Sequence, residues 1–221
     1  MRRARILVVT AVTAERDAVT SRLERDAAPA DVEVVAAGVG PAAAAAATAS
    51  ALTSAAAGGR PFTLAVSTGI AGGFGQPLGG VVVASSIVAA DLGAVTPDGF
   101  ASVADLGFGR AEHHPPPALV RDVAEAADAA SGPVLTVSTV TGTQARAQEL
   151  AARHPGAVAE AMEGFGVAEA AAAQGVPVLE LRTVSNPVGP RDRAAWRIPG
   201  ALAALGTGCA AMLPVLRAWK P

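Results

Sequence analysis

The sequence contains no tyrosine, one cysteine and one lysine, and each scarcity excludes a kind of site. The single cysteine, Cys209, cannot form an internal disulfide or a zinc site of several cysteines, and we expect it to be a small buried residue of the last helix. The lysine, Lys220, lies at the end of the chain, which excludes a Schiff-base or phosphate-loop lysine within the domain. Aromatic residues make up 3% of the chain against 51% hydrophobic residues, many of them alanine. Such a core favours α/β layers of aliphatic strands and closely packed small-residue helices.

The charge and the hydrophobic runs exclude further classes of protein. A formal net charge of -2 leaves no excess of basic side chains for a nucleic-acid backbone. The apolar run near the N-terminus is too short for a signal peptide or a membrane helix, and charged residues soon interrupt it. The longest apolar stretch elsewhere, residues 62–90, is interrupted by glycines and a proline. We therefore predict a cytoplasmic protein whose partners include neither a membrane nor a nucleic acid.

The pattern of apolar runs predicts one α/β domain over residues 1–221. No linker rich in serine, glycine or proline divides the 221 residues. Short apolar runs alternate with segments of helical periodicity, as in a sheet that is buried on both faces. Strands are expected at residues 5–10, 31–37, 62–68, 80–90 and 134–140, and helices at 13–25, 41–57, 118–130, 144–153 and 194–219. The last helix is expected to break near Pro199 and Pro214, and segment 91–117 to be a long loop.

The segment 157–189 carries the polar residues around which we expect the site to form. It predicts a strand that ends at Glu163, a small-residue helix closed by Gly175, and an apolar strand followed by Ser185 and Asn186. Ligands of open α/β sheets bind beyond the carboxyl ends of the strands. A carboxylate at one such end and a carboxamide at the next can hold a sugar and a base.

A further candidate, Glu15, lies in the first turn of the helix expected at 13–25. Thr13 is a suitable N-cap, and the preceding strand brings the N-terminus of this helix to the carboxyl edge of the sheet. A helix N-terminus favours an ionised carboxylate, which makes Glu15 a candidate proton acceptor. Acidic residues also occur in first turns because they complement the helix dipole, and position alone does not separate the two roles.

Two glycine-rich segments follow predicted strands. Gly38, Gly40 and Ala43 match the permissive dinucleotide pattern G-x-G-x-x-A, but they follow the second strand and no acidic residue ends the next one. A turn that leads into a helix beginning with Pro41 explains them more simply. Residues 69–75 are expected to form a loop whose backbone N–H groups can approach a ligand closely.

Glu112, His113 and His114 have side chains that can bind a metal ion. Adjacent histidines point apart on most backbones, and no third histidine lies nearby in the sequence. We therefore favour contacts with solvent, or with substrate as part of a lid, for these residues. We expect neither a metal nor an organic cofactor.

Taken in order, these motifs resemble the purine nucleoside phosphorylase and nucleosidase superfamily, and within it the methylthioadenosine/S-adenosylhomocysteine nucleosidases. The matching pieces are Glu15 after the first strand, G-V-G at 38–40, G-I-A-G-G at 69–73, A-M-E at 161–163 and S-N at 185–186. The blocks A-M-E-G-F-G and R-T-V-S-N-P-V-G-P-R-D-R-A-A-W are more narrowly similar to the futalosine hydrolase family. The resemblance covers the whole chain and implies a three-layer α/β fold in which helices flank a mixed central sheet.

The resemblance also implies roles for individual residues toward a small-molecule purine nucleoside. Glu15 would activate the attacking water, and Glu163 would bind the ribose hydroxyl groups. Met162 would pack on the sugar, and the backbone around Ala71 and Gly72 would border the reacting carbon. The expected catalytic residues are Glu15, Glu163 and Asn186, and the expected substrate contacts are Ala71, Gly72, Met162, Phe165 and Ser185.

Asn186 and Ile70 depart from the pattern of the adenine-cleaving nucleosidases. There the position of Ile70 is normally a small hydroxyl residue, and that of Asn186 an aspartate that protonates or stabilises N7 of the purine. Hypoxanthine carries an oxygen at C6, which an aspartate would repel, whereas a carboxamide can donate to O6 and accept from a protonated N7. We interpret Asn186 as a selector for 6-oxopurines. Its alternative role is that of a turn residue before Pro187.

Water is the favoured nucleophile. Phosphorolysis needs cations near the anomeric carbon, whereas residues 69–75 provide none and Glu15 would repel phosphate. The expected reaction splits futalosine into hypoxanthine and dehypoxanthine futalosine, in menaquinone biosynthesis, and Glu15 and Glu163 stabilise an oxocarbenium-like state. The alternatives are a nucleosidase or phosphorylase for inosine or methylthioadenosine, and a non-catalytic nucleoside sensor.

The carboxyphenyl ketone of futalosine requires an aromatic wall and a cation. The candidates are Phe100, Phe108 and Phe165 for the wall, and Arg110, Arg191, Arg193 and Arg197 for the cation. A solvated basic turn explains the R-D-R cluster equally well. Members of the family that this sequence resembles form oligomers, so we also expect a homo-oligomer.

Overall fold

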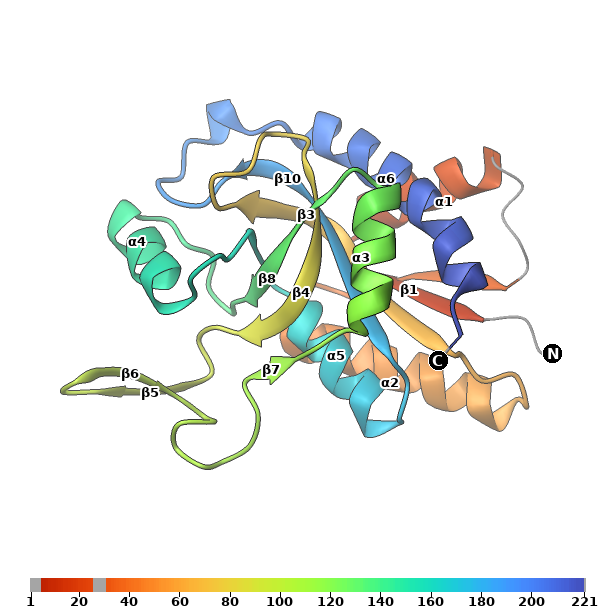
Figure 1. Cartoon of the computed structure of the whole chain (residues 1–221), viewed down its shortest axis with the longest axis horizontal. Helices are drawn as coiled ribbons and strands as arrows, with labels where there is room; N and C mark the ends of the chain where they lie inside the picture. Colours follow the sequence, from red (N-terminus) through yellow and green to blue (C-terminus); the bar gives the residue numbers. More distant parts are fainter. Residues whose placement is uncertain (1–4, 26–30, 221) are drawn as a thin grey trace.

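The computed structural model describes residues 5–25 and 31–220, which form a three-layer α/β fold around a mixed sheet (Figure 1). The sheet consists of β1 (Ile6–Thr10), β2 (Val32–Ala36), β3 (Leu64–Gly73), β4 (Val81–Ala89), β7 (Glu112–His113), β8 (Ala130–Thr136), β9 (Ala159–Ala161) and β10 (Val178–Pro187). One face is covered by α2 (Pro41–Ala57) and α5 (Gly164–Ala173), and the other by α1 (Thr13–Arg25), α3 (Pro117–Ala126) and α6 (Ile198–Ala218). The helix α4 (Gln144–Arg153) packs beside the ends of β4 and β8. The predicted fold class is confirmed.

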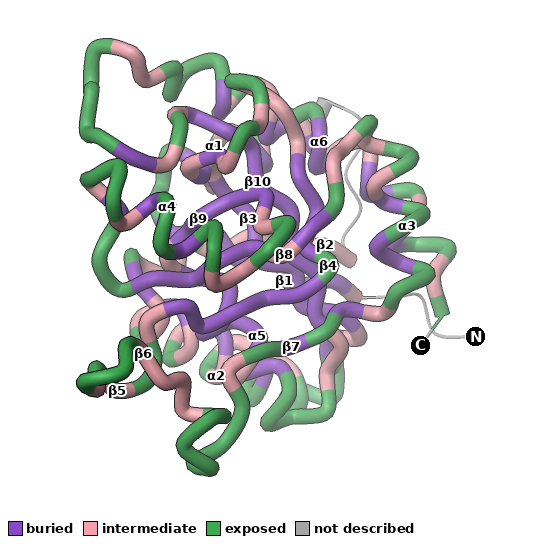
Figure 2. The backbone as a smooth tube through the Cα atoms, turned by 60° about the vertical axis from the view of Figure 1, so that its left-hand side comes forward, coloured by how far each residue is buried: buried purple, intermediate pink, exposed green. Residues whose placement is uncertain are grey.

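Strand β1 shows why the apolar runs of the sequence are continuous. Leu7 and Val9 enter the core on the side of α2 and α5, whereas Ile6 and Val8 enter the core on the side of α1, α3 and α6. Because successive strand residues point to opposite faces, a strand covered on both sides needs apolar residues at every position. Figure 2 shows the strands as the buried centre of the molecule.

Strand β3 connects the two halves of the sheet. It pairs in parallel with β1 and β10 and antiparallel with β9. Because β10 pairs with β4, β4 with β8, and β8 with β9, these five strands close into a ring. The ring brings the carboxyl ends of β3 and β10 next to the short strand β9, and the candidate site forms there.

Several predicted elements agree with the structure. The helices expected at 13–25, 41–57 and 144–153 are α1, α2 and α4 with the same bounds. Gly38 and Gly40 have positive φ angles of 97° and 93°, and Pro41 is the first residue of α2, so the turn interpretation of this segment is confirmed. Cys209 is a free cysteine buried in α6, as predicted.

Three predictions about irregular segments were wrong. Residues 69–73 are not a loop, because pairing with β9 and β10 extends β3 to Gly73. Segment 91–117 holds a hairpin of β5 (Gly93–Thr96) and β6 (Gly99–Ser102), followed by β7. The last helix is not broken at Pro214, since α6 continues through it while packed against α1, α3 and β10. Tertiary packing of α6 thus outweighs the hydrogen bond that a proline removes.

The boundaries of four other elements also shift. The helix expected at 118–130 ends at Ala126, and the strand expected at 134–140 runs from Ala130 to Thr136. Residues 193–195 form a short 3-10 helix (Arg193–Ala195) separate from α6, which begins at Ile198. Strand β9 ends at Ala161, so Glu163 lies at the start of α5 and not in the strand.

Within the described residues, α6 is the one helix long and apolar enough to cross a membrane by length and composition. The sequence was expected to contain no stretch of this kind, and α6 meets the criteria of length and composition all the same. Core helices of soluble proteins pass the same test, and Leu205, Cys209 and Met212 of α6 belong to the buried core.

Candidate active site

Glu15 lies where the carboxyl ends of β1 and β3 meet the first turn of α1. Its side chain is buried, and one carboxylate oxygen, Oε2, accepts hydrogen bonds from the N–H groups of Ala11 at 2.9 Å and Val12 at 3.2 Å. The other oxygen, Oε1, accepts from the N–H of Ile70 at 2.9 Å. Three backbone donors from two strand ends therefore hold the carboxylate in one place.

Glu163 occupies the N-cap position of α5, and its carboxylate is also buried. Its Oε1 accepts from the N–H of Gly40 at 3.2 Å, and its Oε2 accepts from the N–H of Met162 at 3.3 Å. The same Oε2 receives a hydrogen bond from Nη1 of Arg182 at 3.3 Å. The turn before α2 and the strand β10 thus both position this carboxylate.

Arg182, which was not predicted as a site residue, donates to Glu163 and carries a charge that acts on Glu15. The side chain is fully buried on β10, where Nε donates to Glu180 Oε1 at 2.9 Å and Nη2 donates to Ser67 Oγ at 3.0 Å. A Cβ atom at Gly69 would lie 2.6 Å from Glu15 Oε1 and 2.8 Å from Arg182 Nη1, so both groups meet at this glycine. Burial lowers the pKa of Arg182, but the nearby carboxylates outweigh it and leave the pKa above its ordinary value.

Glu180 supports this arrangement from within the core. Burial raises the pKa of its carboxyl group, while the Arg182 guanidinium opposes that effect. A Cβ atom at Gly164 would overlap the Glu180 carboxylate, so α5 must begin with a glycine at this point. Alternating charges in the apolar strand V-L-E-L-R-T-V were the sequence signal for this pair, because residues i and i+2 share one face of a strand.

Ser185 and Asn186 lie at the carboxyl end of β10, as expected from the sequence. Ser185 Oγ lies 2.8 Å from Asn186 Oδ1 and 3.2 Å from the carbonyl oxygen of Ala71, and can donate to either. The carboxamide Nδ2 donates to the carbonyl oxygen of Pro187 at 2.9 Å. Ser185 is buried and Asn186 is half-buried, so the carboxamide is oriented from its buried side.

Asn186 opens into a cavity of about 60 Å³ that brings together the ends of several strands. The lining residues are Gly72, Val140, Thr141, Glu160, Asn186, Pro187, Val188, Gly189, Pro190, Arg191 and Trp196. Glu160, which the sequence analysis also missed, is buried on β9 and accepts from the N–H of Thr141 at 2.8 Å and from its hydroxyl group. Burial raises the pKa of Glu160 although the Thr141 hydrogen bonds act in the opposite direction.

Of the other residues expected to contact the substrate, some lie near the candidate site and one lies in the hydrophobic core. Ala71 is a buried residue of β3 and Met162 is partly exposed beside Glu163. Phe165 lies in the core cluster of α5, where its ring centroid is 5.2 Å from that of His113 and its N–H donates to Thr136 Oγ. Phe165 is therefore a packing residue in this structure.

His113 and His114 point apart, as predicted. His114 is exposed, but His113 is buried on β7 with Nε2 2.8 Å from Glu169 Oε1, so the expectation of solvent or lid contacts was wrong for His113. Pairing of β7 with β4 draws this residue against α5. In residues 5–25 and 31–220 no group of three histidine, cysteine, aspartate or glutamate side chains is placed to hold a metal ion.

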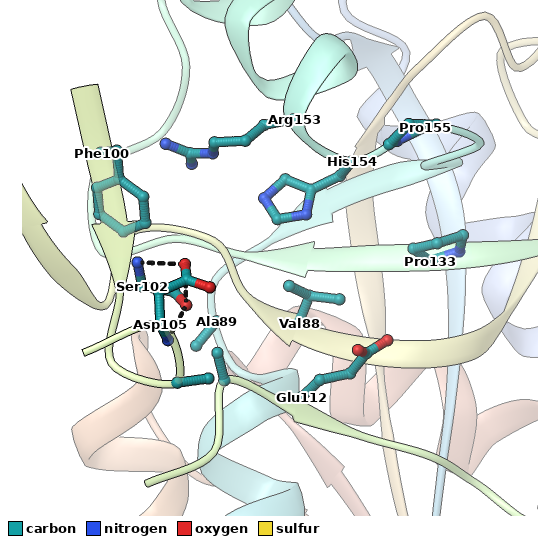
Figure 3. A pocket seen from close by; sticks show the side chains of 12 residues that line it. Val88, Ala89, Phe100, Ser102, Asp105, Glu112, Pro133, Arg153, His154 and Pro155 are labelled. Atoms are coloured by element: carbon teal, nitrogen blue, oxygen red, sulfur yellow. Dashed lines mark hydrogen bonds between the residues drawn. The ribbon is translucent and has the colours of Figure 1, made fainter. Parts of the chain in front are cut away.

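A wider cavity of about 450 Å³ lies under the β5–β6 hairpin and includes Phe100, Glu112, Arg153 and His154 in its lining (Figure 3). The Arg153 guanidinium lies 4.1 Å from the centroid of the Phe100 ring. None of the residues identified from the 157–189 segment or from α1 lines this cavity. We therefore locate the candidate active site at the converging ends of β3, β9 and β10.

The candidate cations and aromatic residues for a substrate tail are scattered. Arg191 lines the cavity at Asn186, where its guanidinium lies 5.6 Å from the ring centroid of Trp196. Arg197 donates to the carbonyl oxygens of Ala194 and Trp196. Phe108 is 82% exposed, and Arg110 and Arg193 are exposed as well.

The structure combines a mixed sheet with buried carboxylates near its strand ends. Comparison of the sequence with known families identifies the class of protein that has this arrangement. The sequence matches the phosphorylase superfamily over residues 10–205, and the chain belongs to this superfamily. Within it, the chain is 60% identical to the futalosine hydrolase of Streptomyces coelicolor over 98% of both chains. It is 48% identical to the futalosine hydrolase of Acidothermus cellulolyticus over 73% of this chain and 70% of that one.

Solved structures share the fold at low sequence identity. A 5'-methylthioadenosine/S-adenosylhomocysteine nucleosidase of Colwellia psychrerythraea, in complex with adenine, superposes with a TM-score of 0.83 at 22% identity and covers 99% of this chain and 98% of its own. The native futalosine hydrolase of Helicobacter pylori has a TM-score of 0.78 at 17% identity, with coverage of 96% and 98%.

Proposed function

We propose that this chain hydrolyses the N-glycosidic bond of futalosine and releases hypoxanthine and dehypoxanthine futalosine, a step of menaquinone biosynthesis. The observation that carries the proposal is the 60% identity to a futalosine hydrolase over 98% of the chain. The geometry supports it, since buried carboxylates meet at the strand ends where nucleosides bind in this type of sheet.

Glu15 is the proposed general base. Its two oxygens accept three hydrogen bonds, from two N–H groups just after β1 and one N–H group of β3. Because a carboxylate offers about four acceptor positions, a water molecule can still bind to it. A carboxylate beside the anomeric carbon deprotonates the attacking water and stabilises the positive charge that develops on the sugar. Glu163, held by Gly40 and Arg182, binds the ribose hydroxyl groups on the other side.

Water is the proposed nucleophile because the charge of the arginine at this site is already offset by carboxylates of the protein. Arg182 is fully buried, and its Nε, Nη1 and Nη2 donate to Glu180, Glu163 and Ser67 respectively. A phosphate would also approach the carboxylates of Glu15 and Glu163, which repel an anion. Both features favour hydrolysis over phosphorolysis.

Asn186 is the proposed contact to the leaving base. The Ser185 hydroxyl group lies within hydrogen-bond distance of Asn186 Oδ1, which leaves the NH2 group of the carboxamide to donate on the other side. One N–H of this group bonds to Pro187, and the second is available for O6 of a 6-oxopurine. This arrangement supports hypoxanthine over adenine as the released base.

The proposed enzyme is a cytoplasmic homo-oligomer. Figure 2 shows that the β5–β6 hairpin projects from the body as an exposed segment. Val95 is 90% exposed in this hairpin, and Phe108, which follows it, is 82% exposed. Large exposed apolar side chains in this part of the chain favour a protein contact, and a second copy of the chain is the proposed partner.

The test is an incubation of the purified chain with futalosine, inosine or methylthioadenosine, each with and without inorganic phosphate, followed by chromatography of the bases. Hypoxanthine should appear from futalosine in the absence of phosphate. Release that requires phosphate would establish a phosphorylase, and release from methylthioadenosine alone would reject the substrate. Binding of futalosine without any turnover would favour a sensor.

A further inference from the structure

Glu160 and Asn186 lie in one row across the sheet with Gly72 between them. Gly72 on β3 is the register partner of Glu160 on β9 and of Asn186 on β10. Neighbouring strands are about 4.7–4.9 Å apart, so the Cα atoms of the two outer residues are separated by about two strand spacings. Both side chains line the same cavity, and they therefore face each other across Gly72.

Gly72 has no side chain, and Val188 occupies the space next to it. A Cβ atom at Gly72 would lie 2.9 Å from Val188 Cγ2 and 3.5 Å from Asn186 Nδ2. Val188 lines the same cavity as Glu160 and Asn186, so its side chain forms the cavity wall at Gly72. The cavity therefore has a hydrogen-bond acceptor on β9, a donor on β10 and an apolar wall at Val188.

The Glu160 carboxylate has acceptor capacity that the protein does not use. Its two oxygens accept from the N–H and the hydroxyl group of Thr141, which leaves further lone pairs directed elsewhere. Among the described residues no arginine or histidine forms an ion pair with it. Arg146 acts on this carboxylate only as a charge at longer range. Burial of a carboxylate without an ion-pair partner is unfavourable, and such a group in a cavity is a candidate for a functional residue.

We infer that Glu160 is a specificity-determining residue that accepts a hydrogen bond from N1–H of the 6-oxopurine, while Asn186 donates to O6 of the same ring. N1–H and O6 are adjacent on a 6-oxopurine. The acceptor of Glu160 and the donor of Asn186 can therefore bind both groups of the same ring. A 6-aminopurine presents an unprotonated N1 and an amino group, and its N1 lone pair would face the Glu160 carboxylate. The inference rests on the proposed function and adds a second contact with the base to that of Asn186.

The variant Glu160→Gln tests this role because it replaces an acceptor oxygen with an NH2 donor of the same shape. We expect kcat/KM for futalosine to fall by about 10- to 100-fold, as for a buried polar group left without its partner. For the 6-amino counterpart of futalosine kcat/KM should stay equal or rise, since Gln can donate to N1. An equal loss on both substrates would overturn the inference and assign Glu160 a structural role.

Binding of the free bases provides a readout that does not depend on glycosidic cleavage. Titration calorimetry with hypoxanthine and adenine should show a preference for hypoxanthine in the wild type and its loss in Glu160→Gln. If the wild type does not cleave futalosine but this switch occurs, the proposed function fails and the role of Glu160 stands. If futalosine is cleaved and the preference is unchanged in the variant, the role of Glu160 alone is rejected.

Two further variants serve as controls. Glu149→Gln changes an exposed glutamate of α4 in the same way and should alter neither substrate preference nor base binding. If Glu160→Gln does not fold, as judged by thermal melting, Thr141→Ala is used because it removes the hydroxyl donor that orients the carboxylate. Thr141→Ala should weaken hypoxanthine binding at least threefold and leave adenine binding unchanged. An unaltered ratio of the dissociation constants of hypoxanthine and adenine would reject the inference.

Discussion

The guanidinium of Arg182 donates to the carboxylate of Glu163 at 3.3 Å, and their side chains are 0% and 7% exposed. Glu163 was predicted from the sequence as a site residue, whereas the residue that orients it was overlooked. Arg182 is itself fixed by Glu180 and Ser67, so the position of the Glu163 carboxylate depends on a buried network in β3 and β10.

Removal of Arg182 should damage both stability and turnover. Arg182→Met leaves Glu180 and Glu163 buried without a cation, and urea unfolding should show a loss of about 3–5 kcal/mol. The double variant Arg182→Met with Glu180→Met should recover much of that stability. Its kcat should nevertheless remain low, because Glu163 still lacks its partner. Full recovery of kcat in the double variant would show that Arg182 does not position Glu163.

Glu15→Gln should separate chemistry from binding. The amide keeps the size of the side chain but cannot take a proton from water, so kcat should fall about 10²- to 10⁴-fold. The dissociation constant of futalosine, measured by calorimetry on the inactive variant, should change little. A rate within threefold of the wild type would exclude Glu15 as the general base.

Asn186→Asp should impair release of hypoxanthine. The second carboxylate oxygen would face O6 where an NH2 group stood, so kcat/KM for futalosine should fall about 10- to 100-fold. Activity toward the 6-amino counterpart should fall less or rise, since a carboxylate can accept from its amino group. Equal rates for Asn186→Asp and wild type on futalosine would support the turn role of this residue.

Entry of the base should move Trp196. Trp196 forms part of the wall of the cavity at Asn186, so a purine that enters this cavity should press on Trp196 and shift it. In a Trp219→Phe variant, which leaves Trp196 as the sole tryptophan, hypoxanthine should change the emission wavelength or intensity. The reciprocal Trp196→Phe variant should show no change, and silent emission in both would argue against this motion.

The raised pKa of Glu160 predicts a pH-dependent stability with a definite sign. The folded state holds this proton more tightly than the unfolded state, so its contribution to stability is complete below the unfolded pKa of about 4.3 and is lost as the pH rises through the folded pKa. Glu160→Gln cannot ionise and should therefore gain stability relative to wild type between about pH 4 and pH 7, measured by urea unfolding at each pH.

Glu149→Gln is the control for these urea-unfolding measurements, because its effect on stability should have the opposite sign. The Arg146 hydrogen bond holds the pKa of Glu149 below its ordinary value, so the wild-type residue stabilises the fold as the pH rises. The variant should lose a little stability over the same range, and the effect is small because the pair is exposed. A difference between Glu160→Gln and wild type that is independent of pH would contradict the burial argument.

The layers of the fold could be predicted from the sequence, because local patterns determine them. The apolar residues at helical spacing after Thr13 specify α1, although Thr13 is the first residue of the helix and not its N-cap as predicted. The run I-L-V-V specifies a strand buried on both faces. Glu15, Glu163 and Asn186 could be named as candidates because polar residues that follow apolar runs are visible in one chain.

The remaining features depend on pairing between distant segments. Residues 69–73 are strand and not loop because β9 and β10 bind them, although glycine itself permits either conformation. The row of Glu160, Gly72 and Asn186 depends on the register of three strands, and a shift by one residue would turn each side chain to the other face. No local pattern contains that register.

Gly166 lies in α5 and is not one of the proposed site residues, yet its lack of a side chain has a genetic consequence. A Cβ atom there would overlap the carbonyl group of Pro41, the residue next to Gly40, whose N–H donates to Glu163. Exchange of glycine for alanine is ordinarily a mild change within a helix, and here it would displace the start of α2 and with it a donor to the Glu163 carboxylate. A screen for inactive alleles should therefore recover substitutions at Gly166 together with those at Glu15 and Glu163.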